Sequence, residues 1–278
     1  MGTAPRAGTT SRAGIPDARR IVVKVGSSSI SGENAGRIAP LVDAIAAAHG
    51  LGAEVVLVSS GAIATGMPFL RLDDRPADLA TQQAAAAVGQ SILVFRYQEA
   101  LDRYGIVAGQ VLLTAGDLAA PDHRENAQRA MERLLGLRIL PIVNENDTVA
   151  THEIRFGDND RLAALVAELV GADALVLLSD VDALYTRPPS EEGAERIAEV
   201  PFGDDLAGVT FGSADATGVG TGGAGTKAAA ARHAAAAGTP VLVTAAGLVA
   251  EALSGQEVGT FFEADRSRVT GAAVGGAA

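Results

Sequence analysis

Short runs of Val, Ile and Leu alternate along the chain with longer segments in which apolar residues recur at helical spacing. Strands that alternate with helices in this way form a mainly parallel sheet with helices on both faces. The sequence therefore predicts an α/β fold, a mainly parallel open sheet sandwiched by helices. We expect buried strands at Ile21–Val25, Val55–Val58, Ile106–Leu113, Ile139–Val143, Ala174–Leu178 and Val241–Val243. We expect helices at Ala35–His49, Leu79–Arg103, Arg124–Leu135, Arg161–Val170 and Lys227–Ala237.

Three stretches lack these patterns. Residues 1–19 are rich in Ser, Thr, Gly and Arg and contain no apolar run long enough for a secretory signal, so we expect a disordered tail there. Residues 187–219 contain Pro188-Pro189 and several acids but little periodicity, which favours loops or a small hairpin. A flexible tail is expected at residues 266–278, which leaves one globular region at residues 20–265.

Composition narrows the classes of function. The 278 residues are 48% hydrophobic, which is enough to form a full core. The 33 acidic and 22 basic side chains give a net charge of −11, which opposes general binding to nucleic acid or to anionic membrane surfaces. No apolar run approaches the roughly 18 residues of a membrane span. Cysteine is absent, which excludes disulfides and thiolate metal sites and permits a cytoplasmic location.

Four of the expected strands end in polar, glycine-containing loops. Ligands of open α/β sheets gather at the carboxyl ends of strands, where loops turn into helices and backbone donors are available. Turns favour Gly, Ser, Asn and Asp in any case, so each loop alone has a structural explanation. Together they indicate one shared site, formed by Gly26–Ser29, Ser59–Ala62, Asn144–Asp147 and Ser179–Asp182.

Lysine is rare and placed in a distinctive way. Of the 22 basic residues 20 are arginine, and Lys24 and Lys227 stand beside the two most glycine-rich loops. A lysine ammonium group is a compact charge with three donors, and it fits between phosphates where a planar guanidinium group does not. The alternatives are a strand-end lysine whose amine reaches solvent and an ordinary first-turn residue of a helix. The glycine-rich context favours phosphate binding.

The loop that ends in Lys227 is not a known nucleotide motif. A Walker sequence needs Gly directly before Lys, but Thr226 occupies that position. The pattern Gly220-x-Gly222 also lacks the preceding strand of a dinucleotide fingerprint. The loop does run into an alanine-rich helix, whose first amides are unpaired donors for an anion.

Acids and amides cluster near two further elements. Asp158 and Asp160 flank the start of a helix, where capping explains one of them. Capping does not explain Asn144, Asn146 and Asp147 after a buried strand, where acids need cationic or metal partners, such as two lysines and magnesium. The four histidines are scattered, so a zinc site is not expected. Ser60 lacks the motif of a serine nucleophile, which favours a ligand-binding hydroxyl.

On these residues the chain resembles the amino acid kinase family between about Arg20 and Phe262. The lysine and glycine elements resemble the whole family, and two segments resemble the branch that phosphorylates glutamate at the start of proline biosynthesis. Those two segments are Asn144-Glu145-Asn146-Asp147 and Gly157-Asp158-Asn159-Asp160. The other matching segments are Val22–Ser27, Val58–Ile63, Leu178–Tyr185 and Gly220–Lys227.

The resemblance implies a role for each matching residue. Lys24 and Lys227 would contact phosphates as catalytic residues, and Asp160 would orient both. The acid would be bound by Ser60, Gly61, Ala62, Asn144, Asp147 and Asn159. ATP would be bound by the two lysines and by Gly26, Ser27, Ser179, Asp180, Thr221, Gly222, Gly223, Ala224, Gly225 and Thr226. Residues 20–170 would hold the acid and residues 171–265 the nucleotide. Magnesium would arrive with ATP, without direct protein ligands.

The resemblance also implies partners and limits. Dimers or tetramers and inhibition by proline are expected. Ala224 stands where a methionine is common, and the RNA-binding-like C-terminal domain of many relatives is not expected in this chain. Two alternatives stay open. The first is another kinase of the family, acting on acetylglutamate, aspartate, carbamate or a nucleoside monophosphate. The second is a non-catalytic sensor of ATP or proline.

Overall fold

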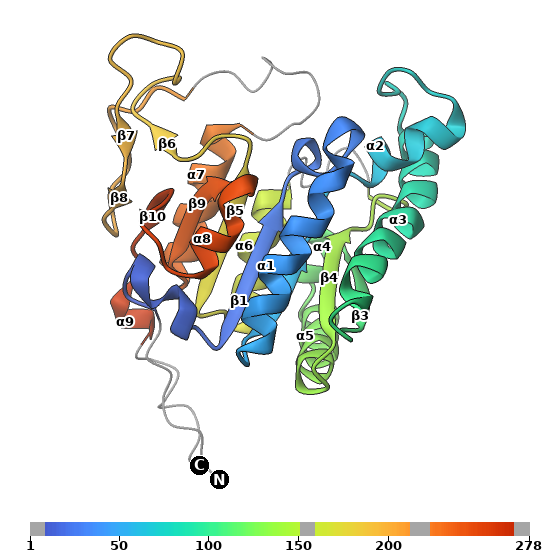
Figure 1. Ribbon diagram of the computed structural model, residues 1–278, viewed down its shortest axis with the longest axis horizontal. Coiled ribbons are helices and arrows are strands. Elements are labelled where there is room, and N and C mark those ends of the chain that lie inside the picture. The colour runs from blue at the N-terminus through green and yellow to red at the C-terminus, as the bar shows by residue number, and fades with distance from the viewer. Residues whose placement is uncertain (1–8, 151–158, 212–222, 270–278) are drawn as a thin grey trace.

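The computed structural model describes residues 9–150, 159–211 and 223–269, and these residues form a central sheet covered by helices on both faces (Figure 1). The strand order is β3-β4-β2-β1-β5-β9-β10-β8, and neighbours are parallel except for β9 with β10. In that order the bounds are Ala108–Leu113, Leu140–Glu145, Glu54–Val58, Arg20–Val25, Ala174–Ser179, Val241–Ala245, Thr260–Phe262 and Glu199–Val200. The expected mainly parallel sheet is confirmed.

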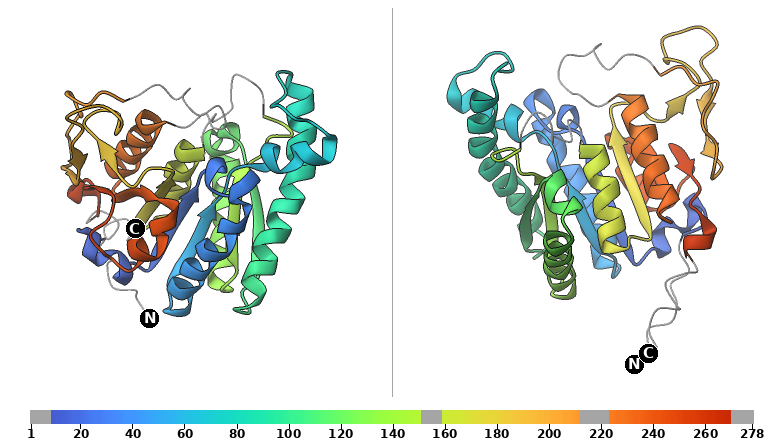
Figure 2. Two further views of the ribbon diagram at one scale, coloured as in Figure 1. Left: turned by 45° about the horizontal axis from the view of Figure 1, so that its top comes forward. Right: turned by 180° about the vertical axis from the view of Figure 1, so that it is seen from behind.

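Side chains of alternate strand residues enter two separate hydrophobic layers. Ile21, Val23 and Val25 of β1 pack with α1, α3 and α8, whereas Val22 packs on the opposite side with α5, α6 and α7. Figure 2 shows these two helical layers with the top of the molecule tilted forward and from behind. The helices α1 to α9 span Ile38–Gly50, Ala62–Gly66, Leu79–Asp102, Ala115–Ala119, Pro121–Gly136, Asn159–Val170, Ala224–Ala236, Val249–Leu253 and Arg266–Val269. None of the helices described has the length and apolar character needed to cross a bilayer.

The expected elements are present, with differences at the edges of the sheet. The strand predicted at Ile106–Leu113 begins at Ala108 and is only partly buried, because β3 is an edge strand with one neighbour. The stretch after Arg187 contributes β7 (Arg196–Ile197), which forms a small antiparallel hairpin with β6 (Leu184–Tyr185), as the sequence allowed. The short strands β8 and β10 lack a sequence signal because two or three residues show no periodicity.

The prediction of a disordered tail over residues 1–19 is wrong for its second half. Residues Arg12–Asp17 form a 3-10 helix, and Ile15 is 1% exposed within the core. The Arg12 guanidinium group donates to the carbonyl oxygens of Ala198 (2.6 Å) and Gly259 (3.4 Å). A single buried isoleucine in a polar stretch is too weak a pattern to reveal this packing.

Two glycines bring helices α2 and α3 into backbone contact. A Cβ atom at Gly89 would overlap the carbonyl oxygen of Ala62 and would lie 2.5 Å from the amide nitrogen of Gly66. A Cβ atom at Gly66 would in turn meet the backbone of Ala85 and Gly89. Helix α2 can therefore pack this closely on α3 only because both positions are glycine.

Arg20 joins the sheet to helix α5 at the end opposite the polar loops. Its buried guanidinium group contacts Glu54 of β2 (2.7 Å) and Glu132 of α5 (2.6 Å), and it also donates to the carbonyl oxygen of Val170. Burial raises the pKa of Glu54, but the hydrogen bond and charge of Arg20 outweigh it and hold that pKa below its ordinary value. Glu54 therefore stabilises the fold as an anion.

We expect Glu54→Gln to lower the free energy of unfolding near neutral pH by about 1–3 kcal/mol, because a charge-assisted hydrogen bond is lost. The folded-state pKa is depressed, so this stabilisation is present above the unfolded pKa and disappears as pH falls through the folded one. Urea unfolding of both proteins across the acid range measures the effect. The exposed pair of Glu125 and Arg129 is the control, and Glu125→Gln should change stability by less than about 0.5 kcal/mol. A pH-independent difference between wild type and Glu54→Gln would contradict the assignment.

Candidate active site

One buried carboxylate contacts both lysines of the chain. Asp160 Oδ1 lies 2.5 Å from Lys24 Nζ, and Asp160 Oδ2 lies 3.1 Å from Lys227 Nζ. Asp160 is 0% exposed, Lys24 2% and Lys227 6%. The three side chains carry a combined charge of +1 at neutral pH, which is costly in a buried place unless an anion binds there. The cluster is therefore suited to bind a multiply charged anion.

Three elements of one layer deliver these groups. Lys24 follows Val22 by two residues on β1, so its side chain leaves the sheet on the side of α6 and α7. Asp160 stands in the first turn of α6, where the helix dipole favours an acid. Lys227 stands in the first turn of α7, and its backbone amide donates to the carbonyl oxygen of Gly223 at 3.3 Å.

The loops after β1 and β2 meet beside this cluster. A Cβ atom added to Gly26 would lie 3.9 Å from Lys24 Nζ, so the backbone of this loop passes close to the amine. A Cβ atom added to Gly61 would lie 3.4 Å from Ser27 Cβ. Gly61 has a φ of 89° and caps the start of α2 at Ala62, a conformation that favours glycine. Gly26, Ser27, Gly61 and Ala62 thus share one edge of the site.

A chain of three side-chain amides runs from the lysine cluster into the protein. Asn159 Nδ2 donates to the carbonyl oxygen of Ser59 and to Asn144 Oδ1, both at 2.6 Å. Asn144 Nδ2 donates to Gln90 Oε1 at 2.7 Å. All three amides are at least nine-tenths buried. The chain connects α6, β4 and α3, and Asn159 directly precedes Asp160.

Ser59 is a second junction between the sheet and α3. Its hydroxyl group lies 3.0 Å from the hydroxyl group of Tyr97, with which it shares a hydrogen bond, and 3.3 Å from the carbonyl oxygen of Ser60. Burial raises the pKa of Tyr97 well above its ordinary value, so this phenol stays protonated. Tyr97 thereby fixes the loop that carries Ser60 and Gly61.

The structure brings together most of the residues named from the sequence. Lys24, Lys227 and Asp160 are in direct contact, and Asn144 bonds to Asn159. Ser60 and Asp147 are partly exposed in the loops after β2 and β4, and Ser179 donates to Asp180 (3.0 Å) at the end of β5. Thr221 and Gly222, like Asp158, lie outside the described residues.

Two details differ from the sequence-based expectation. The glycine loop is shorter than expected, since Ala224, Gly225 and Thr226 already belong to α7, with Gly223 as its N-cap. Gln90 and Tyr97 were missed, because amides and aromatic residues in a long alanine-rich helix resemble ordinary helix surface and core. Their only signal is the buried partner on another element.

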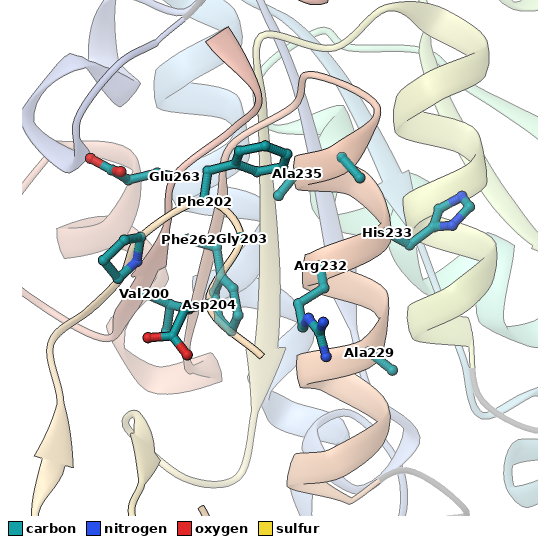
Figure 3. Close-up of a pocket in the computed structure, with 12 residues that line it drawn as sticks. Val200, Phe202, Gly203, Asp204, Ala229, Arg232, His233, Ala235, Phe262 and Glu263 are labelled. Carbon is teal, nitrogen blue, oxygen red and sulfur yellow. The ribbon is translucent and has the colours of Figure 1, made fainter. Parts of the chain in front are cut away.

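A separate hollow of about 370 Å³ lies along the later part of α7 and is bounded by β8, β10 and the loop after β8. Figure 3 shows Arg232, Asp204 and Glu263 around it, with Phe202 and Phe262 beside them. Neither lysine and none of the three amides lines this hollow. It is not part of the site described above.

Metal binding by protein side chains alone finds no support in the part of the chain that the structure describes. No group of three or more His, Cys, Asp or Glu side chains there could hold an ion. Asp160, the most deeply buried acid of the site, is already engaged by two ammonium groups.

Comparisons with known proteins agree with this geometry. The model of the amino acid kinase family matches residues 19–245. The chain is 83% identical to a glutamate 5-kinase of Clavibacter sepedonicus over 92% of this chain and 98% of that protein. It is 58% identical to a glutamate 5-kinase of Streptomyces coelicolor over 92% of this chain and 70% of that protein. The fold resembles carbamate kinase from Giardia lamblia bound to AMP-PNP (TM-score 0.65, 16% identity, 90% of this chain and 100% of that chain).

Proposed function

The chain belongs to the amino acid kinase family, and from this premise we propose that it transfers the γ-phosphoryl group of ATP to the γ-carboxylate of L-glutamate. The products are L-glutamyl 5-phosphate and ADP, and the reaction is the first step of proline biosynthesis. The enzyme is a phosphotransferase with a carboxyl group as acceptor. The observation that carries the mechanism is the single carboxylate of Asp160 between the amines of Lys24 and Lys227.

The reaction needs no general base. A glutamate γ-carboxylate with an ordinary pKa of about 4.3 is already ionised at neutral pH. One of its oxygens attacks the γ-phosphorus in line, the bond from that phosphorus to the β,γ-bridging oxygen breaks, and ADP leaves with the electron pair. Catalysis then depends on positioning and on stabilising the charge of the transferred group.

The two lysines supply that charge stabilisation in this proposal. Their amines share Asp160, so they are held close to each other and their side chains cannot reorient independently. Asp160 also compensates one positive charge while no nucleotide is bound. Lys24 and Lys227 then contact the oxygens of the phosphate chain, with the amides beside Gly26 and at the start of α7 as further donors. Magnesium bound by the phosphates supplies additional charge neutralisation.

Substrate binding is assigned to two groups of residues. The acid lies against the loops after β2 and β4 and the first residues of α2 and α6, a site that includes Ser60, Gly61, Ala62, Asn144, Asp147 and Asn159. ATP lies against the loops after β1 and β5 and the start of α7, a site that includes Gly26, Ser27, Ser179, Asp180, Gly223, Ala224, Gly225 and Thr226. Thr221 and Gly222 complete the proposed nucleotide site. The acid site thus falls within residues 20–170 and most of the nucleotide site within residues 171–265.

The choice of acceptor can be measured directly. We expect ADP release with MgATP to be stimulated by L-glutamate and not by N-acetylglutamate, aspartate, carbamate or UMP. The physical reason is that buried polar groups that hydrogen-bond one acid stay unpaired when a different acid binds, and this lowers kcat/KM for the second acid by orders of magnitude. Stimulation by a different acceptor would reassign the substrate. Binding of ATP and glutamate without ADP formation would instead indicate a sensor.

We also propose inhibition by proline, a dimeric or tetrameric assembly and a cytoplasmic location, where ATP is available for the reaction. End-product inhibition is chemically reasonable, because proline retains the α-carboxylate and α-nitrogen of glutamate. Repeating the assay with proline, and measuring the mass in solution, tests the first two.

A further inference from the structure

The amide chain of the site ends in a buried donor that no described residue satisfies. Gln90 is 8% exposed, and its Oε1 accepts from Asn144 Nδ2. Its Nε2 is fully covered and has no hydrogen-bond partner among the described residues. A buried donor without an acceptor is rare in folded proteins and lowers their stability. Gln90 therefore needs an explanation that its contribution to folding does not provide.

Backbone contacts fix the orientation of each amide in the chain, so the unsatisfied atom of Gln90 is its donor and not its acceptor. Asn144 Oδ1 accepts from the backbone amide of Glu145 at 3.0 Å, and a backbone N–H can only donate. Asn159 Nδ2 donates to the carbonyl oxygen of Ser59, which can only accept. Asn144 therefore donates from its Nδ2 to Gln90, and the Gln90 atom that accepts this hydrogen bond must be Oε1.

A second glutamine of α3 shows what a structural amide looks like in this protein. Gln98 Oε1 accepts from the backbone amide of Ala108 at 2.8 Å. Gln98 Nε2 donates to Asp102 Oδ1 at 2.6 Å and to the carbonyl oxygen of Ile106 at 3.1 Å. Both ends of Gln98 are thus used to pack α3 on β3. Gln90 uses one end only, although it is the more deeply buried of the two.

We propose that Gln90 is a specificity-determining residue of the acid site, and that its Nε2 donates a hydrogen bond to the α-carboxylate of the bound glutamate. The inference rests on the proposed function. Asn159 is adjacent to Asp160, where the reacting γ-carboxylate meets the phosphates. Gln90 is two hydrogen bonds further from Asp160 along the chain, and we therefore assign it to the opposite end of the acid. A charged carboxylate forms a stronger hydrogen bond with a buried amide donor than a neutral acceptor does.

Two variants separate this role from indirect ones. Gln90→Glu keeps an oxygen that can accept from Asn144 and removes the donor, whereas Gln90→Met removes both. Both should raise KM for glutamate by about 10- to 100-fold, the effect of one lost hydrogen bond to a charged group, and leave KM for ATP within about 2-fold. Gln90→Met removes the unsatisfied Nε2 but also leaves Asn144 Nδ2 without its acceptor, so the thermal midpoint should stay close to that of wild type. The matched control Gln98→Met should lower the thermal midpoint and keep KM for glutamate.

The acceptor 4-aminobutyrate, which is glutamate without its α-carboxylate, identifies the atom involved. The wild-type preference for glutamate over 4-aminobutyrate in kcat/KM should shrink by about 10-fold or more in both Gln90 variants. An unchanged preference, or a Gln90→Glu protein with normal KM for glutamate, would overturn the proposal and leave Gln90 a role through Asn144 at most. Lack of glutamate phosphorylation by the wild-type protein would refute the proposed function instead, so the two failures are distinguishable.

Discussion

Replacing Lys24 with alanine should lower the turnover number by about 10²- to 10³-fold, the cost of removing one donor that stabilises a transition state. The ammonium group of Lys24 is 2.5 Å from Asp160 and buried, so neither water nor a neighbouring arginine can easily take its place. Lys24→Arg should also be strongly impaired, because a planar guanidinium group is too broad for the place of a compact ammonium. Steady-state ADP release with saturating ATP and glutamate measures both variants.

The controls separate chemistry from folding. Lys24→Ala removes one of the two lysines that contact Asp160, and breaking a buried ion pair lowers the free energy of unfolding by up to about 3–5 kcal/mol. The circular dichroism spectrum and the thermal midpoint of each variant should therefore be measured together with its turnover number. Lys24→Arg is the second control, because it keeps the positive charge next to Asp160. Arg129→Ala removes an exposed cation on α5 and should leave turnover unchanged. Turnover of Lys24→Ala within a few-fold of wild type would remove Lys24 from the mechanism.

Gly89→Ala should lower the free energy of unfolding by about 3 kcal/mol and should also raise KM for glutamate. The new methyl group overlaps the backbone of Ala62 and lies 2.5 Å from the amide nitrogen of Gly66, so α2 must move away from α3. Backbone atoms cannot rotate aside as a side chain can, so the loss of stability should be near the upper end of the range of about 1–3 kcal/mol that is typical of overpacked cores. The displaced helix carries Gly61 and Ala62, which we assign to the acid site.

Urea unfolding and glutamate kinetics of Gly89→Ala test this account together. Gly136→Ala, at the end of α5, is the matched control, since a Cβ atom there meets nothing within 4 Å. That variant should be neutral or slightly stabilising, because alanine favours helix more than glycine does. A Gly89→Ala protein as stable as wild type, with normal KM, would show that α2 is not held by this contact.

The central strands and the charged cluster could be predicted because each has a strong local signal. A parallel strand buried on both faces must be a continuous run of Val, Ile and Leu, as Val55–Val58 is. Lys24 and Lys227 stand out because the other 20 of the 22 Lys and Arg residues are all arginine. The position of Asp160 between them was implied by the resemblance to the amino acid kinase family, and the contacts of Asp160 with both amines agree with it.

Other features depend on tertiary contacts that leave no periodic trace. Gln90 and Gln98 look alike in the sequence of α3, and only their partners on β4 and β3 distinguish an unsatisfied amide from a structural one. Gly66 and Gly89 read as weak points of helices, although they permit the closest approach of α2 to α3. The packing of Ile15 against the core was missed for the same reason.

The proposed mechanism requires the ammonium groups of Lys24 and Lys227 to contact the same triphosphate. Lys24 and Lys227 are the only lysines of the chain, so protein labelled with ¹⁵N in lysine side chains gives ammonium NMR signals from these two residues alone. Addition of AMP-PNP with magnesium should shift both signals and slow hydrogen exchange at both amines, with the same dependence on nucleotide concentration. If either signal stays unchanged at saturation, the two lysines do not act on one nucleotide, and the proposed mechanism is wrong.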